Sequence, residues 1–387
     1  MKTFIKSLTF AAMAVVLIST GCSRNKTEDL KVWAWLGTNA AQSDSLLEHY
    51  FRNAAEAGID AVFYESHGGY PEILDSTTFT DLAGIDHLTR AARFAEKYGV
   101  ELHAWMWTTN RCEKTLRKAH PEWYQVTAKG ENLADIKMYN REHYRFLCPN
   151  HEGVMDYMKE RVREIAAIEG VAGIHMDFIR YPDAMLPYAL HESRGVVQDR
   201  IYPDWDCCYC DECRAKFKAE TGIDPLDLED PTSNEQWMQF RYRTMADYAS
   251  EIAAEIKACG KISSAAVFAT PEESKKLVRQ DWVNFRNVDY FMPMIYNSAY
   301  GFPDEWIETA TREGIEGLKA ANNPAGFLSG LSMGGRRMSE RVDSLKACAA
   351  YAVAGGSPGI CIFSLDSFNR AENGWAVLKE IVASIKQ

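Results

Sequence analysis

A carboxylate stands near the end of one of the most apolar runs in the sequence. The run Gly173–Tyr181 reads Gly-Ile-His-Met-Asp-Phe-Ile-Arg-Tyr, so Asp177, Arg180 and Tyr181 fall close together. Burying an ionised carboxylate is costly unless its charge is paired, and Asp177 has no obvious purpose in folding. Arg180 is a candidate for that pairing, which would make the two residues a structural brace. We favour the alternative, a catalytic carboxylate with Arg180 and Tyr181 beside it as substrate ligands.

Cysteines form a second group of chemically capable residues. Six of the ten lie in two segments, and Cys208, Cys210 and Cys213 form a C-x-C-x-x-C motif. Three thiolates at this spacing suit a tetrahedral zinc site, for which Cys148 is our predicted fourth ligand and Cys112 or Cys207 the alternatives. The spacing resembles the structural zinc cluster of some barrel β-galactosidases. In an exported protein the same thiols can instead form disulfides, and both interpretations stay open.

The elements that would position these residues alternate along the chain. From residue 31, short β-rich runs alternate with amphipathic stretches, a pattern that predicts a parallel sheet with helical connections. The expected strands are Val32–Gly37, Ala61–Ser66, Glu101–Thr108, Gly173–Tyr181, Ile262–Ala269, Val288–Asn297, Gly326–Met333 and Gly359–Asp366. The expected helices are Ser43–Ala57, Asp86–Tyr98, Gly153–Ile168, Asn234–Ala258, Ser339–Ala354 and Gly374–Lys386.

Eight strands with intervening helices predict an α/β fold of the closed (β/α)8 type, the TIM barrel. An open doubly wound sheet is the alternative, but Gly37-Thr38-Asn39 stands where that fold has a Gly-rich phosphate turn. Two connections, Thr109 to about Gly153 and Pro182 to about Glu235, are too long to be simple loops. They follow the third and fourth strands at the face where barrel enzymes build their sites.

The string Gly173–Pro182 resembles the strand-four signature of the glycosyl hydrolase-like family 10 proteins. Two further segments, Phe146–Asn150 and Val288–Tyr296, resemble that family's motifs before strand four and at strand six. The resemblance covers most of residues 31–385 in order. It implies a barrel that acts on glycans, and some relatives are envelope lipoproteins thought to cut peptidoglycan strands. The chain departs from the family at Glu65–Tyr70, where a turn richer in Arg and Asp is expected. This departure bears on which substrate is bound more than on the class of reaction.

Glycoside hydrolysis usually needs two carboxyl groups, one a proton donor and the other a nucleophile or base, and requires no cofactor. Asp177 is the first candidate. Glu65 and Asp366, at the ends of two other expected strands, are equally good candidates for the second. Glu272 and Glu273 are better explained as acidic residues in the first turn of a helix.

Aromatic and polar residues near the strand ends fit a sugar-binding cleft. For any single tryptophan, packing in the core is an equally good explanation, and the strand tryptophans could face either the barrel interior or the helices. His67 precedes two glycines and is expected either to bind a sugar hydroxyl or to cap a turn. The predicted substrate ligands, besides Arg180 and Tyr181, are Trp35, His67, Trp107, Tyr296 and Asn297.

The beginning of the chain reads as an export signal. A short basic region precedes the apolar run Phe10–Ile18, and small residues lead to Cys22. This resembles a bacterial lipobox, with Ser19 in place of the usual Leu, so Cys22 is expected to carry a lipid; a plain cleaved signal is the alternative. We therefore predict a signal peptide over 1–21, a tether over 22–30 and a single barrel domain over 31–387, anchored in the bacterial cell envelope.

The overall charge of the chain argues against some classes of function. A net charge of −11 and an isoelectric point of about 5.4 argue against a nucleic-acid binder, which should show a basic face. The expected partners are a glycan and, through the lipid, a membrane. Our main hypothesis is a glycoside hydrolase, and the alternative is a non-catalytic glycan-binding lipoprotein that lacks one carboxylate. A metal-dependent hydrolase or deacetylase would need more histidines at the strand ends.

Overall fold

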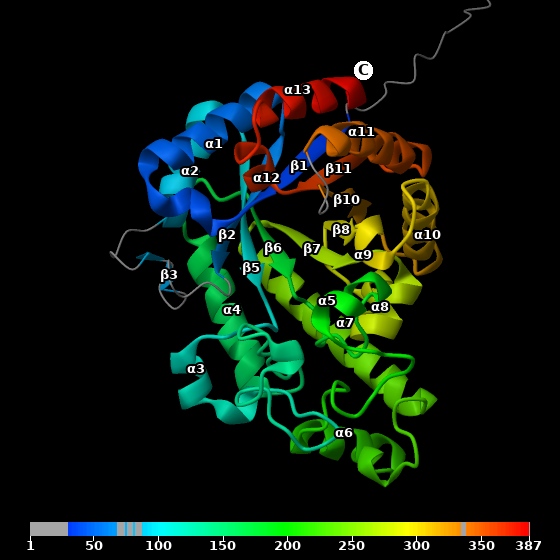
Figure 1. The fold of residues 1–387 in the computed structure, drawn as a ribbon. Coiled ribbons are helices and arrows are strands. Elements are labelled where there is room, and N and C mark those ends of the chain that lie inside the picture. Colours follow the sequence, from blue (N-terminus) through cyan, green and yellow to red (C-terminus); the bar gives the residue numbers. More distant parts are fainter. Residues whose placement is uncertain (1–29, 68–73, 76–79, 82–86, 334–337, 387) are drawn as a thin grey trace, which may run out of the picture.

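The computed structural model describes residues 30–67, 74–75, 80–81, 87–333 and 338–386, and places a barrel of parallel strands inside a ring of helices (Figure 1). The strand order is β10-β11-β1-β2-β5-β6-β7-β8-β9, and the sheet closes because β10 also pairs with β8 through Gly330 and Met294. The predicted (β/α)8 barrel is confirmed. Its strands are β1 (Lys31–Leu36), β2 (Ala61–His67), β5 (Glu101–Trp107), β6 (Gly173–Asp177), β7 (Ile262–Phe268), β8 (Tyr290–Met294), β9 (Gly326–Phe327), β10 (Ser329–Ser332) and β11 (Gly359–Phe363).

A helix follows each barrel strand, with β9 and β10 counted as two halves of one strand. These helices are α1 (Asp44–Ala57), α2 (His87–Tyr98), α4 (Glu152–Ala166), α7 (Glu235–Ala258), α8 (Pro271–Val278), α10 (Trp306–Ala320), α11 (Met338–Ala354) and α13 (Gly374–Ile385). Shorter elements decorate the connections: β3 (Leu74–Asp75), β4 (Thr80–Asp81), α3 (Lys114–Ala119), α5 (His191–Arg194), α6 (Asp211–Thr221), α9 (Asn297–Tyr300) and α12 (Leu365–Asn369).

Helix α10 was missed by the sequence pattern, and its glycines explain why. Glycine weakens a helix interior, so Gly314 and Gly317 obscure the periodicity. Both are required by packing. A Cβ at Gly314 would lie 2.5 Å from the Phe327 ring, and one at Gly317 would lie 3.0 Å from Pro271.

Three strands end earlier than expected, and this matters for the site. Strand β6 stops at Asp177 because Phe178 adopts a left-handed backbone conformation, with φ of 49°, which turns the chain. Strand β8 ends at Met294, and β11 ends at Phe363. Asp366 therefore lies on α12, not on a strand.

Two apolar layers hold the barrel. Alternate residues of each strand point outward to the helices, while the others fill the interior. The strand tryptophans belong to the interior group, which resolves the open question about their direction. That interior group consists of Trp33, Trp35, Ala61, Phe63, Trp105, Trp107, Ala266, Met292, Leu328 and Cys361.

The two long connections form one structured wall at the carboxyl ends of the strands, as the lower part of Figure 1 shows. They are joined by an isolated bridge between Thr127 and Cys207. The second connection is tied to the barrel helices by a buried carboxylate, because Asp206 accepts from Arg241 at 2.7 Å and from Arg279 at 2.9 Å. Removal of one partner from such a buried ion pair is strongly destabilising, because it leaves an uncompensated buried charge.

The predicted signal peptide, Cys22 and most of the tether lie outside the described residues. Within the described part of the chain, no helix is long and apolar enough to cross a membrane.

Candidate active site

A cavity of about 780 Å³ opens at the carboxyl ends of the barrel strands. Its walls come from β1, β2, β5, β6, β7, β8 and β11 and from segments that follow several of these strands, so residues far apart in sequence meet there. Most of the predicted site residues line it. They are Trp35, Glu65, Trp107, Asp177, Arg180, Tyr296 and Asp366.

Asp177 is the last residue of β6, and both of its carboxylate oxygens are held. Trp105 Nε1 donates to Oδ2 at 3.0 Å, and the amide of Phe178 donates to Oδ1 at 2.6 Å. The turn at Phe178 brings that amide into place. Burial raises the pKa of Asp177, while the two N–H donors oppose the shift by stabilising the ionised form. The result is a carboxylate of fixed orientation at the floor of the cavity.

Glu65 lies near the end of β2, where the pairing with β5 shifts between Glu65 and His67. Its side chain is only 3 % exposed, and Oε2 accepts from the amide of Thr38 at 3.3 Å. Burial raises the pKa of Glu65 to about 8, and the negative charges of Asp177 and Asp366 add to the shift. Glu65 is therefore mainly protonated at neutral pH.

Asp366 lies in the first turn of α12 and shares a small space with Glu65. Its Oδ2 accepts from the amide of Gly37 at 3.0 Å and from Ser364 Oγ at 3.2 Å. A Cβ placed on Gly37 would lie 3.4 Å from Asp366 Oδ2 and 3.7 Å from Glu65 Oε2. The absence of a side chain at Gly37 thus leaves room between the two carboxyl groups.

The ring order of the strands explains how the three carboxyl groups are arranged. Strands β6 and β11 lie on opposite sides of the closed ring, and β2 lies midway between them. Glu65 is therefore placed between Asp177 and Asp366. Three carboxyl groups therefore face one cavity, and burial favours the protonated form of Glu65.

Three of the aromatic residues that we predicted as substrate ligands lie together in the cavity. Trp35, Trp107 and Tyr296 line the cavity. Trp35 Nε1 donates to His175 Nε2 inside the barrel at 3.0 Å, so only its ring faces a ligand. His67 ends β2, but its side chain lies outside the described residues.

Arg180 lines the cavity and does not pair with Asp177, so the structural brace that we did not favour is absent. Its guanidinium forms an ion pair with Asp183 at 3.1 Å and donates to Tyr144 Oη and the carbonyl of Tyr181. Since β6 ends before Arg180, the side chain reaches the next loop and not the strand end. Arg180 therefore holds the wall of the cavity, and its charge still lowers the pKa of Asp177.

Tyr181 and Asn297 do not line the cavity, which corrects their prediction as substrate ligands. Tyr181 is buried in the outer core, because the strand that we expected to reach it ends at Asp177. Asn297 opens α9, where its Nδ2 donates to the carbonyl of Phe302 and to Asp304 Oδ1. It fixes a turn.

Several lining residues were not predicted. Most of them come from the long connections and from the turns that follow strands. In the sequence, only their position in those segments marks them as candidates. The polar and aromatic ones include Asn39, Tyr139, Arg141, His143, Tyr144, Asp183, Arg194, Tyr300, Phe363 and Arg370.

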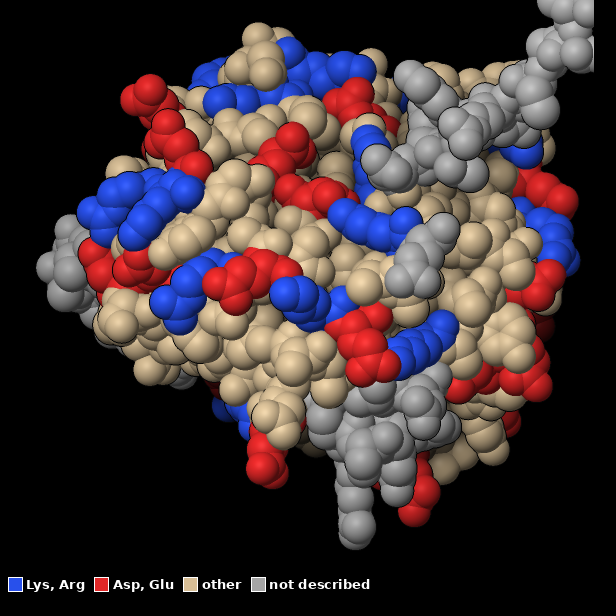
Figure 2. Space-filling model, turned by 90° about the horizontal axis from the view of Figure 1, so that it is seen from above, with Lys and Arg blue, Asp and Glu red and all other residues tan. Residues whose placement is uncertain are grey.

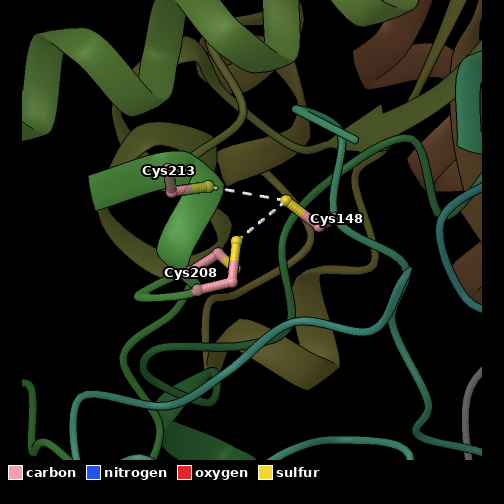
Figure 3. A group of neighbouring side chains, drawn as sticks. Cys148, Cys208 and Cys213 are labelled. Carbon is pink, nitrogen blue, oxygen red and sulfur yellow. Dashed lines mark hydrogen bonds between the residues drawn. The ribbon is translucent and has the colours of Figure 1, made fainter. Parts of the chain in front are cut away.

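The four cysteines that we predicted as zinc ligands lie close together, and none of them lines the cavity. Their sulfur atoms all lie within 4.8 Å of one another, and Cys148 Sγ is 3.5 Å from the sulfurs of both Cys210 and Cys213. Figure 3 shows Cys148, Cys208 and Cys213 from the two long connections around a common space. Tetrahedral zinc with bonds of about 2.3 Å separates its sulfur ligands by about 3.8 Å, whereas a disulfide needs about 2.05 Å. The donor set and spacing fit zinc.

Comparison with known proteins assigns the chain to a class. Residues 110–319 match the model of the family DUF4015, described as "Putative glycosyl hydrolase domain", and the chain belongs to this family. No curated protein matches the sequence.

Solved structures share the fold at low identity. The glycoside hydrolase domain of PgaB (BpsB) from Bordetella bronchiseptica has 12 % identity and a TM-score of 0.57, covering 91 % of this chain and 99 % of that one. The catalytic domain of β-amylase from Paenibacillus polymyxa has 10 % identity and a TM-score of 0.62, covering 93 % and 99 %. A β-galactosidase from Marinomonas ef1 has 10 % identity and a TM-score of 0.58, covering 92 % and 59 %. At these identities the likeness shows the fold alone.

Proposed function

We propose that this protein hydrolyses the glycosidic bonds of a poly- or oligosaccharide with Glu65 as the general acid and Asp177 as the nucleophile or base. One observation carries the proposal. The deeply buried Glu65, whose pKa is raised to about 8, lies in the same cavity as two carboxylates held by N–H and O–H donors. A carboxyl group that stays protonated beside an ionised one is the acid and base pair that glycoside hydrolysis requires.

Each carboxyl group has a separate task in this mechanism. Glu65 gives its proton to the leaving oxygen as the glycosidic bond breaks. Asp177, fixed by Trp105 and Phe178, attacks the anomeric carbon or removes a proton from the attacking water. Asp366 positions Gly37 and contributes the negative charge that helps keep Glu65 protonated. A non-catalytic glycan-binding protein would have no use for this set.

The test of the acid is the Glu65→Gln variant. We expect it to lower kcat by about 10²–10⁴-fold on glycans with ordinary sugar leaving groups, because proton transfer contributes about that much. On a dinitrophenyl glycoside, whose leaving group needs no proton, the loss should be below about 10-fold. Release of reducing ends from a glycan panel and of dinitrophenolate measures the two rates.

The pH profile provides a second readout. In the wild type, kcat/KM should fall above pH about 8 as Glu65 loses its proton, and this alkaline limb should vanish in Glu65→Gln. Glu272→Gln is the matched control, since Glu272 lies in the first turn of α8 and outside the cavity lining. Equal losses on both leaving groups would show that Glu65 is not the acid. A wild type that hydrolyses none of the panel would count against the proposed activity itself.

We also propose that a lipid on Cys22 anchors the protein in the cell envelope, on the basis of the apolar run and the small residues before that cysteine. The Cys22→Ser variant should move the protein from the membrane fraction to the soluble fraction, while its mass loses the lipid. Fractionation followed by mass spectrometry checks this. An unchanged membrane fraction would contradict lipidation at Cys22.

For the cysteine group we propose a structural zinc ion, held by Cys148, Cys208, Cys210 and Cys213. When bound it would supply a fixed joint between the two long connections. Because these cysteines do not line the cavity, no step of the hydrolysis passes through the metal.

A further inference from the structure

Three arginines on the cavity wall are not used by the proposed mechanism. Arg141 and Arg194 come from the connections after β5 and β6, and Arg370 follows α12. Elsewhere most arginines are neutralised, as Arg180 is by Asp183 at 3.1 Å. Within the described part of the chain, Arg141, Arg194 and Arg370 form no ion pair.

Two of these cations, Arg141 and Arg194, lie on the wall that the long connections build. The guanidinium of Arg141 lies over the Tyr144 ring, 5.0 Å from its centroid. The pKa of His143 is lowered to about 4, first by burial and then by the positive charges of Arg141 and Arg194. Both cations therefore lie near the same imidazole, which is itself neutral at physiological pH.

Such a cluster is unexpected in this protein. The chain has a net charge of −11, and over the face seen in Figure 2 acidic and basic side chains are interspersed. Like charges that lie near one another repel, and water screens this repulsion at Arg194, whose side chain is exposed. An anion bound between Arg141 and Arg194 would offset that repulsion.

We propose that the glycan substrate carries an anionic group, a uronate carboxylate or a sulfate ester, that binds to Arg141 and Arg194. This inference rests on the proposed function and assigns its substrate class. A guanidinium group presents a planar fork of N–H donors that matches both anions, and such charge-assisted bonds are among the strongest in recognition. Arg370, near Asp366, provides a third cation on the part of the wall that follows β11.

The experiment compares matched pairs of oligosaccharides. Each uronate-containing oligosaccharide is paired with its carboxyl-reduced form, and each sulfated one with its desulfated form. Binding is measured by calorimetry on the inactive Asp177→Asn protein, and kcat/KM on the wild type. We expect the charged member of at least one pair to be favoured by about 10-fold or more. The kind of pair that shows the preference distinguishes a carboxylate from a sulfate.

Two variants assign the preference to the site. Arg141→Gln combined with Arg194→Gln should bring the two members of the pair within about twofold of each other, mainly through KM. Arg200→Gln is the matched control, because Arg200 also stacks on a tyrosine of the long connections but does not line the cavity. It should keep the full preference.

The possible failures are distinguishable. Equal binding of both members of every pair, no binding of any charged member, or a preference that survives the double variant would overturn this inference. Hydrolysis of neutral glycans would leave the proposed function intact in those cases. Conversely, charge-selective binding without turnover of any glycan would support the anion site while contradicting the hydrolase.

Discussion

Asp177→Asn is expected to lower kcat on the glycan substrate by about 10⁴-fold or more, the size of loss seen when one member of a catalytic unit is removed. In the proposed mechanism the carboxylate attacks the anomeric carbon or activates water, and an amide does neither. Substrate affinity should change little, because the cavity wall is untouched. Initial rates on the wild-type substrate and calorimetric binding to the variant measure the two effects.

The fold should survive this change, at a cost in stability. Both oxygens of Asp177 accept N–H donors, so an amide NH2 would face either Trp105 Nε1 or the amide of Phe178. An unpaired buried donor costs about 1–3 kcal/mol. Trp105→Phe is the control that removes one donor and keeps the carboxylate, so it should retain far more activity than Asp177→Asn. Circular dichroism and the melting temperature establish that each variant is folded.

The anomeric configuration of the wild-type product decides between the two roles of Asp177, because retention requires a covalent intermediate on Asp177 and inversion requires direct attack by water. Rescue by a small anion then tests the position of the carboxylate. In Asp177→Ala the space left by the carboxylate admits azide, which attacks the anomeric carbon while Glu65 protonates the leaving oxygen. The product is a glycosyl azide, and its anomeric configuration identifies the face from which Asp177 acts. Activity of Asp177→Asn within about 10-fold of the wild type would refute the catalytic assignment.

The sequence picked out three carboxyl groups that line one cavity, but it could not give their geometry. Asp177 could be recognised as a candidate because burial of a carboxylate in a strand is costly, so its presence there indicates a function. The choice between Glu65 and Asp366 was beyond the sequence, since it depends on burial and on the packing around Gly37. Only the structure shows that Glu65 is the enclosed group, with Asp366 facing the same space.

The errors share one physical cause, the length of a strand. Tyr181 and Asn297 were expected to face a ligand because the apolar runs around them continue the strand pattern. A single left-handed residue, Phe178, ends β6 early and redirects the chain. Arg141 and Arg194 were missed for a related reason, because the conformation of a long connection follows from tertiary contacts and has no sequence period.

Loss of one cysteine ligand is expected to destabilise the whole wall of the cavity. Zinc contributes several kcal/mol to the folding of small metal sites, and in a domain of this size a loss of about 5 kcal/mol lowers the melting temperature by about 7 °C. Cys148→Ser should show this fall and should purify without metal. The wild type should hold one zinc per chain, by mass spectrometry of protein prepared without chelator.

Cys259→Ser is the matched control, since it makes the same chemical change at the end of α7, outside the four-cysteine group. It should retain zinc and melt near the wild type. If Cys148→Ser does not fold, cobalt substitution in the wild type remains decisive, because tetrahedral cobalt thiolate has a distinctive visible spectrum. Metal-free wild-type protein, with Cys148 recovered in a disulfide with Cys210 or Cys213, would refute the zinc site.

The position of the cysteines separates this effect from catalysis. Cys148 belongs to the connection after β5 and the other three to the connection after β6, so the metal would join the two segments that carry Arg141 and Arg194. Removal of zinc from folded protein should therefore raise KM for a charged glycan while the alkaline limb set by Glu65 stays in place. A metal that took part in the chemistry would shift the pH of that limb. A metal that only braces the cavity wall leaves this pH unchanged, because the limb is set by the buried carboxyl group of Glu65.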